Sequence, residues 1–244
     1  MIHDLLLGAL VDSEDEHGLT PLMTAVEAGY PLIIYQLLKA AANTNIVTSL
    51  SFTALHFAAK RGDDGIVNML LSKGANPNIR TVSTSDSPLS IAVTSGHVAV
   101  VTTLLQGSTY VDPQQYAMSL HNPQPLNKSV AMRQFRIAKL LFEAGYASVS
   151  ELNDGLRCIN AESVEALPRS EQEAYHFLKT HGSSTLSLEQ KCRQVIRKCL
   201  ERKICDKVNL LGLPPSMQDY VTYRYSFTPI SLESEREIYN YFGM

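Results

Sequence analysis

The stretch that decides the fold runs Thr48-Ser-Leu-Ser-Phe-Thr-Ala-Leu-His-Phe-Ala-Ala-Lys-Arg-Gly62, and it nearly repeats an earlier stretch, Asp15-Glu-His-Gly-Leu-Thr-Pro-Leu-Met-Thr-Ala-Val-Glu-Ala-Gly29. The two are offset by 33 residues, and a third copy, Ser87-Pro-Leu-Ser-Ile-Ala-Val-Thr-Ser-Gly96, follows at an offset of 34. Such a period is typical of repeat proteins, in which each unit buries its apolar face by stacking on its neighbours. The sequence therefore predicts a stack that offers a binding surface and no catalytic pocket.

Each copy predicts a short first helix with a defined start and end. Thr20 and Thr53 can cap this helix through the side-chain oxygen. Pro21 and Pro88 suit its first position, where no N–H is needed. In every copy the helix is expected to end at a glycine, which can turn the backbone left-handed: Gly29, Gly62 and Gly96.

A second helix follows in each copy and carries an apolar stripe. The stripe is formed by leucine pairs: Leu37 and Leu38, Leu70 and Leu71, Leu104 and Leu105. Small residues in the first helices let neighbouring helices approach closely: Ala25, Ala58, Ala59 and Ala92. The pattern thus predicts pairs of helices packed in layers.

These residues resemble the ankyrin repeat, with Thr-Pro-Leu or Thr-Ala-Leu-His56, an Ala-Ala pair, a Gly and then Leu-Leu-x-x-Gly74-Ala-Asn-Pro-Asn78. The resemblance implies an all-α ankyrin-repeat solenoid of about four repeats over residues 15–146, behind an N-terminal capping helix over residues 1–14. It also implies that His56 and His97 serve turns and hydrogen bonds between repeats.

The fourth repeat is expected to be degenerate. Met118-Ser-Leu-His121 can begin it, and an insertion that holds Pro123 and Pro125 interrupts it. Residues 137–145 then supply its second helix, and the repeat pattern fades after Gly145.

Composition excludes several classes of protein. A net charge of -3 and a pI near 6.2 argue against nucleic-acid binding by the whole protein. No segment has the roughly 18 to 20 apolar residues that a membrane-spanning helix needs. The apolar run over residues 1–11 is short and contains Asp4, so we interpret it as a first helix and not as a signal peptide.

All four cysteines lie in the C-terminal half of the chain: Cys158, Cys192, Cys199 and Cys205. None belongs to a C-x-x-C pair of the kind found in zinc and thioredoxin-type sites. The cysteines therefore predict a reducing compartment, the cytoplasm or also the nucleus, and we expect no metal and no cofactor.

A different pattern begins at Ser187. Ser187-Leu-Glu-Gln190 is a capping box, and it opens a helix with an apolar face formed by Leu188, Cys192 and Ile196. An extended segment, Leu211-Gly-Leu-Pro-Pro-Ser-Met217, follows and leads into a second short helix. Two plainer interpretations stay open: the apolar face can be ordinary core, and Cys192 a simple buried thiol.

The two halves of this C-terminal region together resemble a SOCS box, and the whole chain is similar to the ankyrin-repeat and SOCS-box family. The resemblance implies a helical connector over residues 147–183, the box over 184–225 and a tail over 226–244. It assigns elongin C binding to Leu188, Cys192 and Ile196, and cullin binding to Leu211, Leu213 and Pro214. Cullin-5 is expected rather than cullin-2, although Gly212 stands where the family pattern has a proline.

The family resemblance implies a substrate-recognition subunit of an elongin B-C/cullin E3 ubiquitin ligase with its RING protein. In such a complex the repeats bind a protein substrate that is then ubiquitinated and degraded by the proteasome. Turn residues are the candidates for substrate contact: His17, Leu19, Leu50 and Phe52.

Two alternatives belong to other classes of protein. A ubiquitin transferase with Cys158 or Cys205 as nucleophile lacks any nearby pattern that indicates a base, so we expect no catalytic residues. A pure ankyrin scaffold would use the C-terminal region only to cap the stack, without recruiting a ligase.

Overall fold

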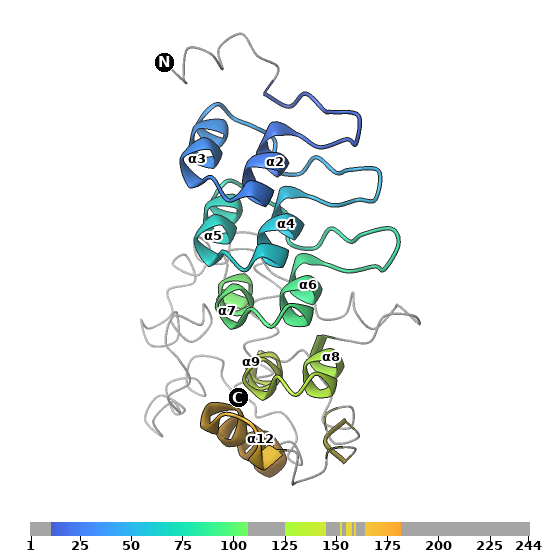
Figure 1. The fold of residues 1–244 in the computed structure, drawn as a ribbon, viewed down its shortest axis with the longest axis vertical. Coiled ribbons are helices and arrows are strands. Elements are labelled where there is room, and N and C mark those ends of the chain that lie inside the picture. Colours follow the sequence, from blue (N-terminus) through green and yellow to red (C-terminus); the bar gives the residue numbers. More distant parts are fainter. Residues whose placement is uncertain are drawn as a thin grey trace, which may run out of the picture.

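The computed structural model describes residues 11–106, 125–144, 152, 155–157, 159 and 164–181. Within these residues the secondary structure is helix and turn, without strands (Figure 1). Most of the predicted capping helix, the predicted box and the tail lie outside the described residues. The limits that we predict for these regions therefore stay predictions.

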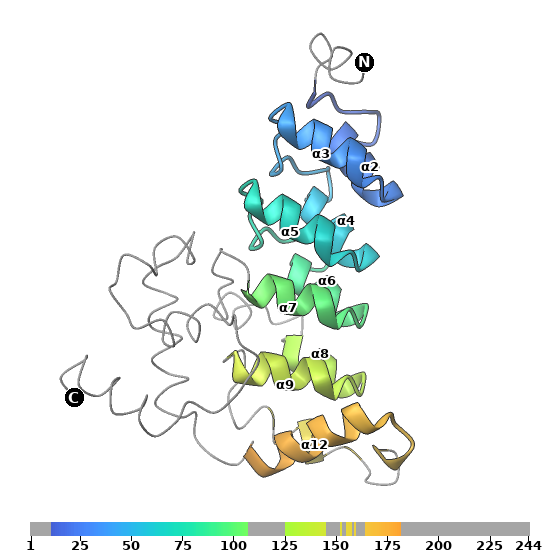
Figure 2. The same ribbon diagram turned by 90° about the vertical axis from the view of Figure 1, so that its left-hand side faces the viewer.

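Four pairs of short helices form the stack. They are α2 (Pro21–Ala28) with α3 (Pro31–Lys39), α4 (Ala54–Arg61) with α5 (Asp64–Ser72), α6 (Pro88–Thr94) with α7 (Val98–Gln106), and α8 (Pro125–Ala131) with α9 (Phe135–Glu143). The first helices of the pairs pack on one another in one column, and the second helices form a parallel column (Figures 1 and 2). This is the all-α solenoid that the repeat predicts.

The predicted starts of the first helices are confirmed. The Oγ1 of Thr20 accepts from the N–H of Met23 at 3.3 Å, and the Oγ of Ser87 accepts from the N–H of Ser90 at 3.2 Å. Thr53 caps α4 in a capping box, in which its own N–H donates to the Nδ1 of His56 at 3.0 Å. Each cap satisfies a backbone donor that the helix itself leaves free.

The predicted glycine turns are also confirmed, and each lies against the next repeat. Gly29, Gly62 and Gly96 have φ angles of 75°, 87° and 76°. A Cβ atom at Gly62 would lie 2.6 Å from the ring of His97, and one at Gly29 would overlap the guanidinium of Arg61. Glycine therefore avoids backbone strain at all three turns, and at Gly62 it also leaves room for the ring of His97.

The side chains that cover these glycines also bind the repeats together. The Nη1 of Arg61 donates to the carbonyl of Glu27 at 3.0 Å, and the Nε2 of His97 lies 3.1 Å from the carbonyl of Lys60. Both carbonyls belong to the last turn of a first helix, where no intrahelical donor reaches them. His97 thus has the inter-repeat role that we predict for it.

The fourth repeat corrects one prediction. Pro125, which we expected inside an interrupting insertion, is buried at the first position of α8, where proline needs no N–H. Residues 118–121 lie outside the described residues. Arg133 occupies the turn that glycine occupies in the other repeats, with a φ of 58°, so the repeat departs from the pattern at this turn.

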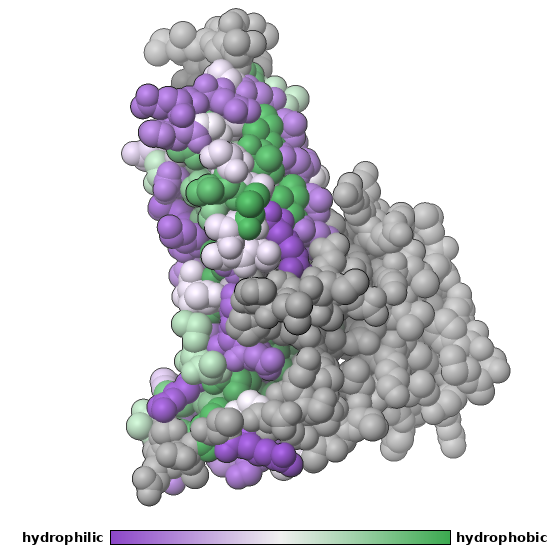
Figure 3. Space-filling view, turned by 90° about the vertical axis from the view of Figure 1, so that its right-hand side faces the viewer, coloured by the Kyte–Doolittle hydropathy of each residue, from purple (hydrophilic) through white to green (hydrophobic). Residues whose placement is uncertain are grey.

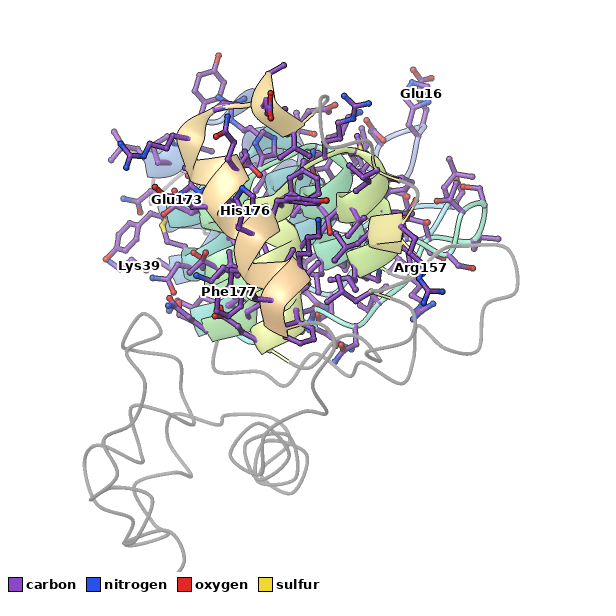
Figure 4. All side chains as sticks on the ribbon, turned by 90° about the horizontal axis from the view of Figure 1, so that it is seen from below. Glu16, Lys39, Arg157, Glu173, His176 and Phe177 are labelled. Atoms are coloured by element: carbon purple, nitrogen blue, oxygen red, sulfur yellow. The ribbon has the colours of Figure 1, made fainter. Side chains whose placement is uncertain are left out.

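Beyond the fourth pair, α12 (Arg169–His181) packs on α9 and continues the column of second helices (Figures 2 and 4). The rings of Phe135 and Tyr175 meet edge to face at 5.1 Å, and the N–H of Arg136 donates to the Oε2 of Glu171 at 2.9 Å. This helix lies within the predicted helical connector, and it covers the apolar end of the stack.

One apolar core runs through all of these layers, from Leu22 in α2 to Leu178 in α12. The leucine pairs of the second helices belong to it, as predicted. Among the described residues no helix is long and apolar enough to cross a membrane.

Replacement of Arg133 by glycine should stabilise the protein. Because a residue with a Cβ is strained at a φ of 58°, we expect Arg133→Gly to raise the free energy of unfolding by about 0.5 to 1 kcal/mol. Urea unfolding monitored by circular dichroism would measure this. Arg133→Ala is the matched control, because it removes the long side chain and keeps the Cβ. Equal stabilisation by both variants would contradict the assignment of strain to the backbone.

Candidate protein-binding surface

In the described part of the chain, three loops project from one edge of the stack, each just before a first helix (Figure 1). We call them finger 1 (residues 15–19), finger 2 (48–52) and finger 3 (81–86). In each finger the first N–H donates to the last carbonyl, at 3.0, 2.9 and 2.9 Å respectively. Finger 3 is one residue longer than the other two.

A side-chain oxygen at the first position also closes each finger. The Oδ1 of Asp15 accepts from the N–H groups of Leu19 and His17, and these bonds, that from Leu19 above all, lower the pKa of the Asp15 carboxyl. The hydroxyl of Thr48 accepts from the N–H of Phe52, and that of Thr81 plays the same part in finger 3. The three fingers are therefore built alike and are internally hydrogen-bonded.

Hydrogen bonds also join fingers 2 and 3. The N–H of Asn76 donates to the Oδ1 of Asn45 at 2.8 Å, between the segments that precede these fingers. Closer to the tips, the N–H of Val82 donates to the carbonyl of Leu50 at 3.1 Å. Because fingers 2 and 3 are joined at both levels, they form one surface whose shape is set before any partner binds.

The first helices contribute a second row of side chains at one equivalent position per repeat. This inner row consists of Thr24, Phe57, Ile91 and Lys128. Phe57 contacts Phe52 of finger 2, with ring centroids 5.8 Å apart. The row therefore passes from a polar residue through two apolar ones to a lysine.

Lys128 is held within the stack. Its Nζ lies 2.9 Å from the Oδ1 of Asp86 and 3.1 Å from the Oγ of Ser90. The two charged side chains are 18% and 19% exposed, so the pair is largely shielded from water. It neutralises the only acid of finger 3 and connects the fourth repeat to the third.

His56 lies beneath fingers 2 and 3 and is fully buried. Its Nδ1 lies 2.8 Å from the hydroxyl of Thr53, and its Nε2 lies 3.3 Å from the carbonyl of Asp86. Burial lowers the pKa of His56 to about 4. The ring is therefore neutral near pH 7 and joins two repeats, the structural role that we predict for it.

The substrate-contact candidates divide into two kinds. At the tips, the side chain of His17 is 73% exposed and Leu50 is 54% exposed. Leu19 and Phe52 are partly buried at the bases of their fingers. Sequence reasoning missed Val82, which is 70% exposed, because the extra residue of finger 3 shifts its tip out of the repeat alignment.

Residues with reactive or ligating groups do not gather elsewhere in the described part of the chain. There, no group of three His, Cys, Asp or Glu residues could hold a metal ion. The cysteines lie outside the described residues, as do the six residues predicted to bind elongin C and the cullin: Leu188, Cys192, Ile196, Leu211, Leu213 and Pro214. The structure thus does not test these assignments.

Family comparisons identify both modules of the chain. A family model described as ankyrin repeats in three copies matches residues 1–81, and a family model described as the SOCS box matches residues 184–222. The stack is therefore an ankyrin-repeat array, and the chain joins it to a SOCS box. The chain belongs to the family of ankyrin-repeat and SOCS-box proteins.

Similar proteins agree with this assignment. "Ankyrin repeat and SOCS box protein 11" of Danio rerio is 30% identical over 169 residues, which are 69% of this chain and 53% of that protein. The protein of the same name in Mus musculus is 29% identical over 170 residues, 70% of this chain and 49% of its own length. The chain thus spans about half the length of these two relatives.

A plant protein resembles the chain over a shorter region. "Probable E3 ubiquitin-protein ligase XBOS34" of Oryza sativa is 40% identical over 97 residues, which are 38% of this chain and 19% of that protein.

The buried histidine should make stability depend on pH. The unfolded chain takes up a proton on His56 near pH 6.5, whereas the folded protein does so only near pH 4. We therefore expect the contribution of His56 to the free energy of unfolding to be complete above pH 6.5, to fall as the pH drops to 4 and to level off below pH 4. The loss should be on the order of 3 kcal/mol.

Urea unfolding between these pH values would measure the effect. His56→Gln should make the free energy of unfolding depend less on pH in this range, because glutamine can serve the capping box and does not titrate. His17→Gln, at an exposed position, is the control and should leave the profile unchanged. A His56→Gln profile as steep as that of the wild type would contradict the account.

Proposed function

We propose that this protein is the substrate-recognition subunit of an E3 ubiquitin ligase built on elongins B and C and a cullin. The observation that carries the proposal is the match of residues 184–222 to the SOCS box, C-terminal to a preformed protein-binding stack. The rice relative is named a probable E3 ubiquitin-protein ligase, which supports the same class of function. Ubiquitination of the bound substrate would lead to its degradation by the proteasome.

In this mechanism the chain contributes proximity and no catalytic residue. The finger surface holds a substrate while the box holds the elongins, the cullin and its RING protein. A charged ubiquitin-conjugating enzyme is thereby placed beside substrate lysines. Holding two reactants together raises the rate because the entropy of bringing them together is lost on binding and not in the reaction.

The box would bind its partners through the residues that the family pattern assigns. Leu188, Cys192 and Ile196 would present one apolar helix face to elongin C, where the small thiol of Cys192 suits a tight pocket. The segment from Leu211 to Pro214 would select the cullin, and we propose cullin-5. Glycine at position 212 leaves this segment more flexible than proline would, which reduces its preorganisation.

The ankyrin-scaffold alternative requires the box helix to pack on α12. However, α12 already buries most of its apolar side chains against the stack: Ala174 is 4% exposed, Tyr175 is 5% exposed and Leu178 is 0% exposed. Phe177 is partly buried, with the Nζ of Lys139 4.3 Å from its ring centroid. Its exposed positions are mainly polar, such as Glu173 and Lys179. Since α12 has little apolar surface left to offer, an external partner for the box helix is the better explanation. The cytoplasm or nucleus, where we propose the protein acts, would supply that partner.

Co-purification with elongins tests the proposal. We expect the wild-type chain, co-expressed with elongins B and C, to retain both. Leu188→Ala with Cys192→Ala should reduce retention at least tenfold, because about 1.4 kcal/mol of lost apolar contact already accounts for such a change. Quantitative gel analysis of the affinity-purified complexes is the measurement.

The matched control is a basic residue of the same predicted helix, outside the apolar face formed by Leu188, Cys192 and Ile196. Lys198→Ala should leave elongin retention unchanged. Failure of the wild type to retain elongins would exclude the ligase function. Equal retention by the double variant would instead exclude the assigned binding face.

A further inference from the structure

We propose that the fingers bind an extended protein segment in which Lys or Arg lies four and six residues from two apolar side chains on the same face. The inference rests on the proposed function, because it takes the finger surface to be the substrate site. It specifies the chemistry of the substrate segment that this surface recognises.

The apolar part of the surface lies on fingers 2 and 3. Leu50 and Val82 are 54% and 70% exposed, and a backbone hydrogen bond between these same residues holds their tips together. Val47, just before finger 2, is 42% exposed. Figure 3 looks onto this side of the stack and shows apolar surface within its upper half. Adjacent exposed apolar side chains on a preformed surface favour an apolar partner.

The acidic part of the surface lies at finger 1. Glu14, Asp15 and Glu16 are consecutive and all exposed. The side chain of Glu16 is 87% exposed and points away from the stack (Figure 4). Bonds from the backbone keep the carboxyl of Asp15 ionised, since they lower its pKa.

Fingers 2 and 3 offer no comparable charge. Residues 48–52 include no ionisable side chain, and the single acid of finger 3, Asp86, is neutralised by Lys128. The surface is therefore acidic at its N-terminal end and apolar beyond it, as the hydrophilic upper end in Figure 3 also indicates. A partner that complements both parts must carry positive charge on one side of an apolar pair.

The spacing within the partner follows from the stacking of the repeats. Packed helices lie roughly 10 Å apart, which sets the distance from finger 1 to finger 2. The tips of fingers 2 and 3 are closer together, about 5 Å, because the N–H of Val82 donates to the carbonyl of Leu50. An extended chain advances about 3.3 Å per residue, and residues separated by an even number face the same side. Apolar side chains four and six residues from a basic one would therefore face the tips of fingers 2 and 3 while the basic one lies over finger 1.

Fluorescence anisotropy with the full chain and defined peptides tests this proposal. The probe is fluorescein-labelled Lys-Lys-Ser-Ser-Ser-Leu-Ser-Val, together with the same residues in reverse order. We expect one of these two peptides to bind at least tenfold more tightly than its counterpart with Glu in place of Lys. Its binding should weaken as the salt concentration is raised. Replacement of its Leu and Val by Ser should weaken binding at least tenfold.

Variants of the protein make the test specific. Leu50→Ser with Val82→Ser should weaken binding of the Lys probe at least tenfold. Glu14→Lys with Glu16→Lys should reverse the preference, so that the Glu peptide binds more tightly. Leu32→Ser is the matched control, since Leu32 is 80% exposed on α3 and lies in the other column of helices.

Three results would overturn the proposal. The first is that neither orientation of the peptide binds at 1 mM, a concentration that corresponds to a binding free energy of roughly 4 kcal/mol. The others are Lys and Glu peptides that bind within twofold of each other, or a charge-swapped variant that keeps the original preference. Elongin retention by the same variants separates this proposal from the ligase function. The Leu50 and Val82 variant should retain elongins fully. Loss of elongins with intact peptide binding would count against the ligase function alone.

Discussion

The architecture depends on the close approach of neighbouring repeats at the end of each first helix. At Gly29 and Gly62 the backbone has a positive φ, and a side chain of the next repeat fills the space where a Cβ would be. Those side chains, Arg61 and His97, also bond to the carbonyls that the helix end leaves open. A single constraint therefore fixes the turn and the spacing of the repeats, and it supplies hydrogen bonds between them.

The fixed spacing of the repeats also sets the positions of the fingers at the other edge of the stack. Because the repeats cannot move apart freely, the three fingers lie at regular intervals, and fingers 2 and 3 are hydrogen-bonded to each other. The exposed positions of the fingers differ in chemistry, while each finger keeps the same closing hydrogen bond. Acids on finger 1 and apolar residues on fingers 2 and 3 turn a generic repeat surface into one with a definite charge pattern.

The helix ends could be predicted from the sequence because they depend on residues within one turn, as at Thr20 and Gly29. The start of α8 at Pro125 and the tip at Val82 could not, since altered loop lengths shift them out of the repeat alignment. The ion pair of Lys128 and Asp86 could not be predicted either, because it joins residues 42 positions apart at sites where the residue type differs between repeats. The assigned box residues stay predictions, because they lie outside the described residues.

The central claim is that the fingers and the box bind different partners at the same time. The most direct test is the affinity of the Lys-bearing probe peptide for the chain alone and for its purified complex with elongins B and C. The account predicts dissociation constants that agree within about twofold, or roughly 0.4 kcal/mol. Displacement of the peptide by the elongins would contradict the account.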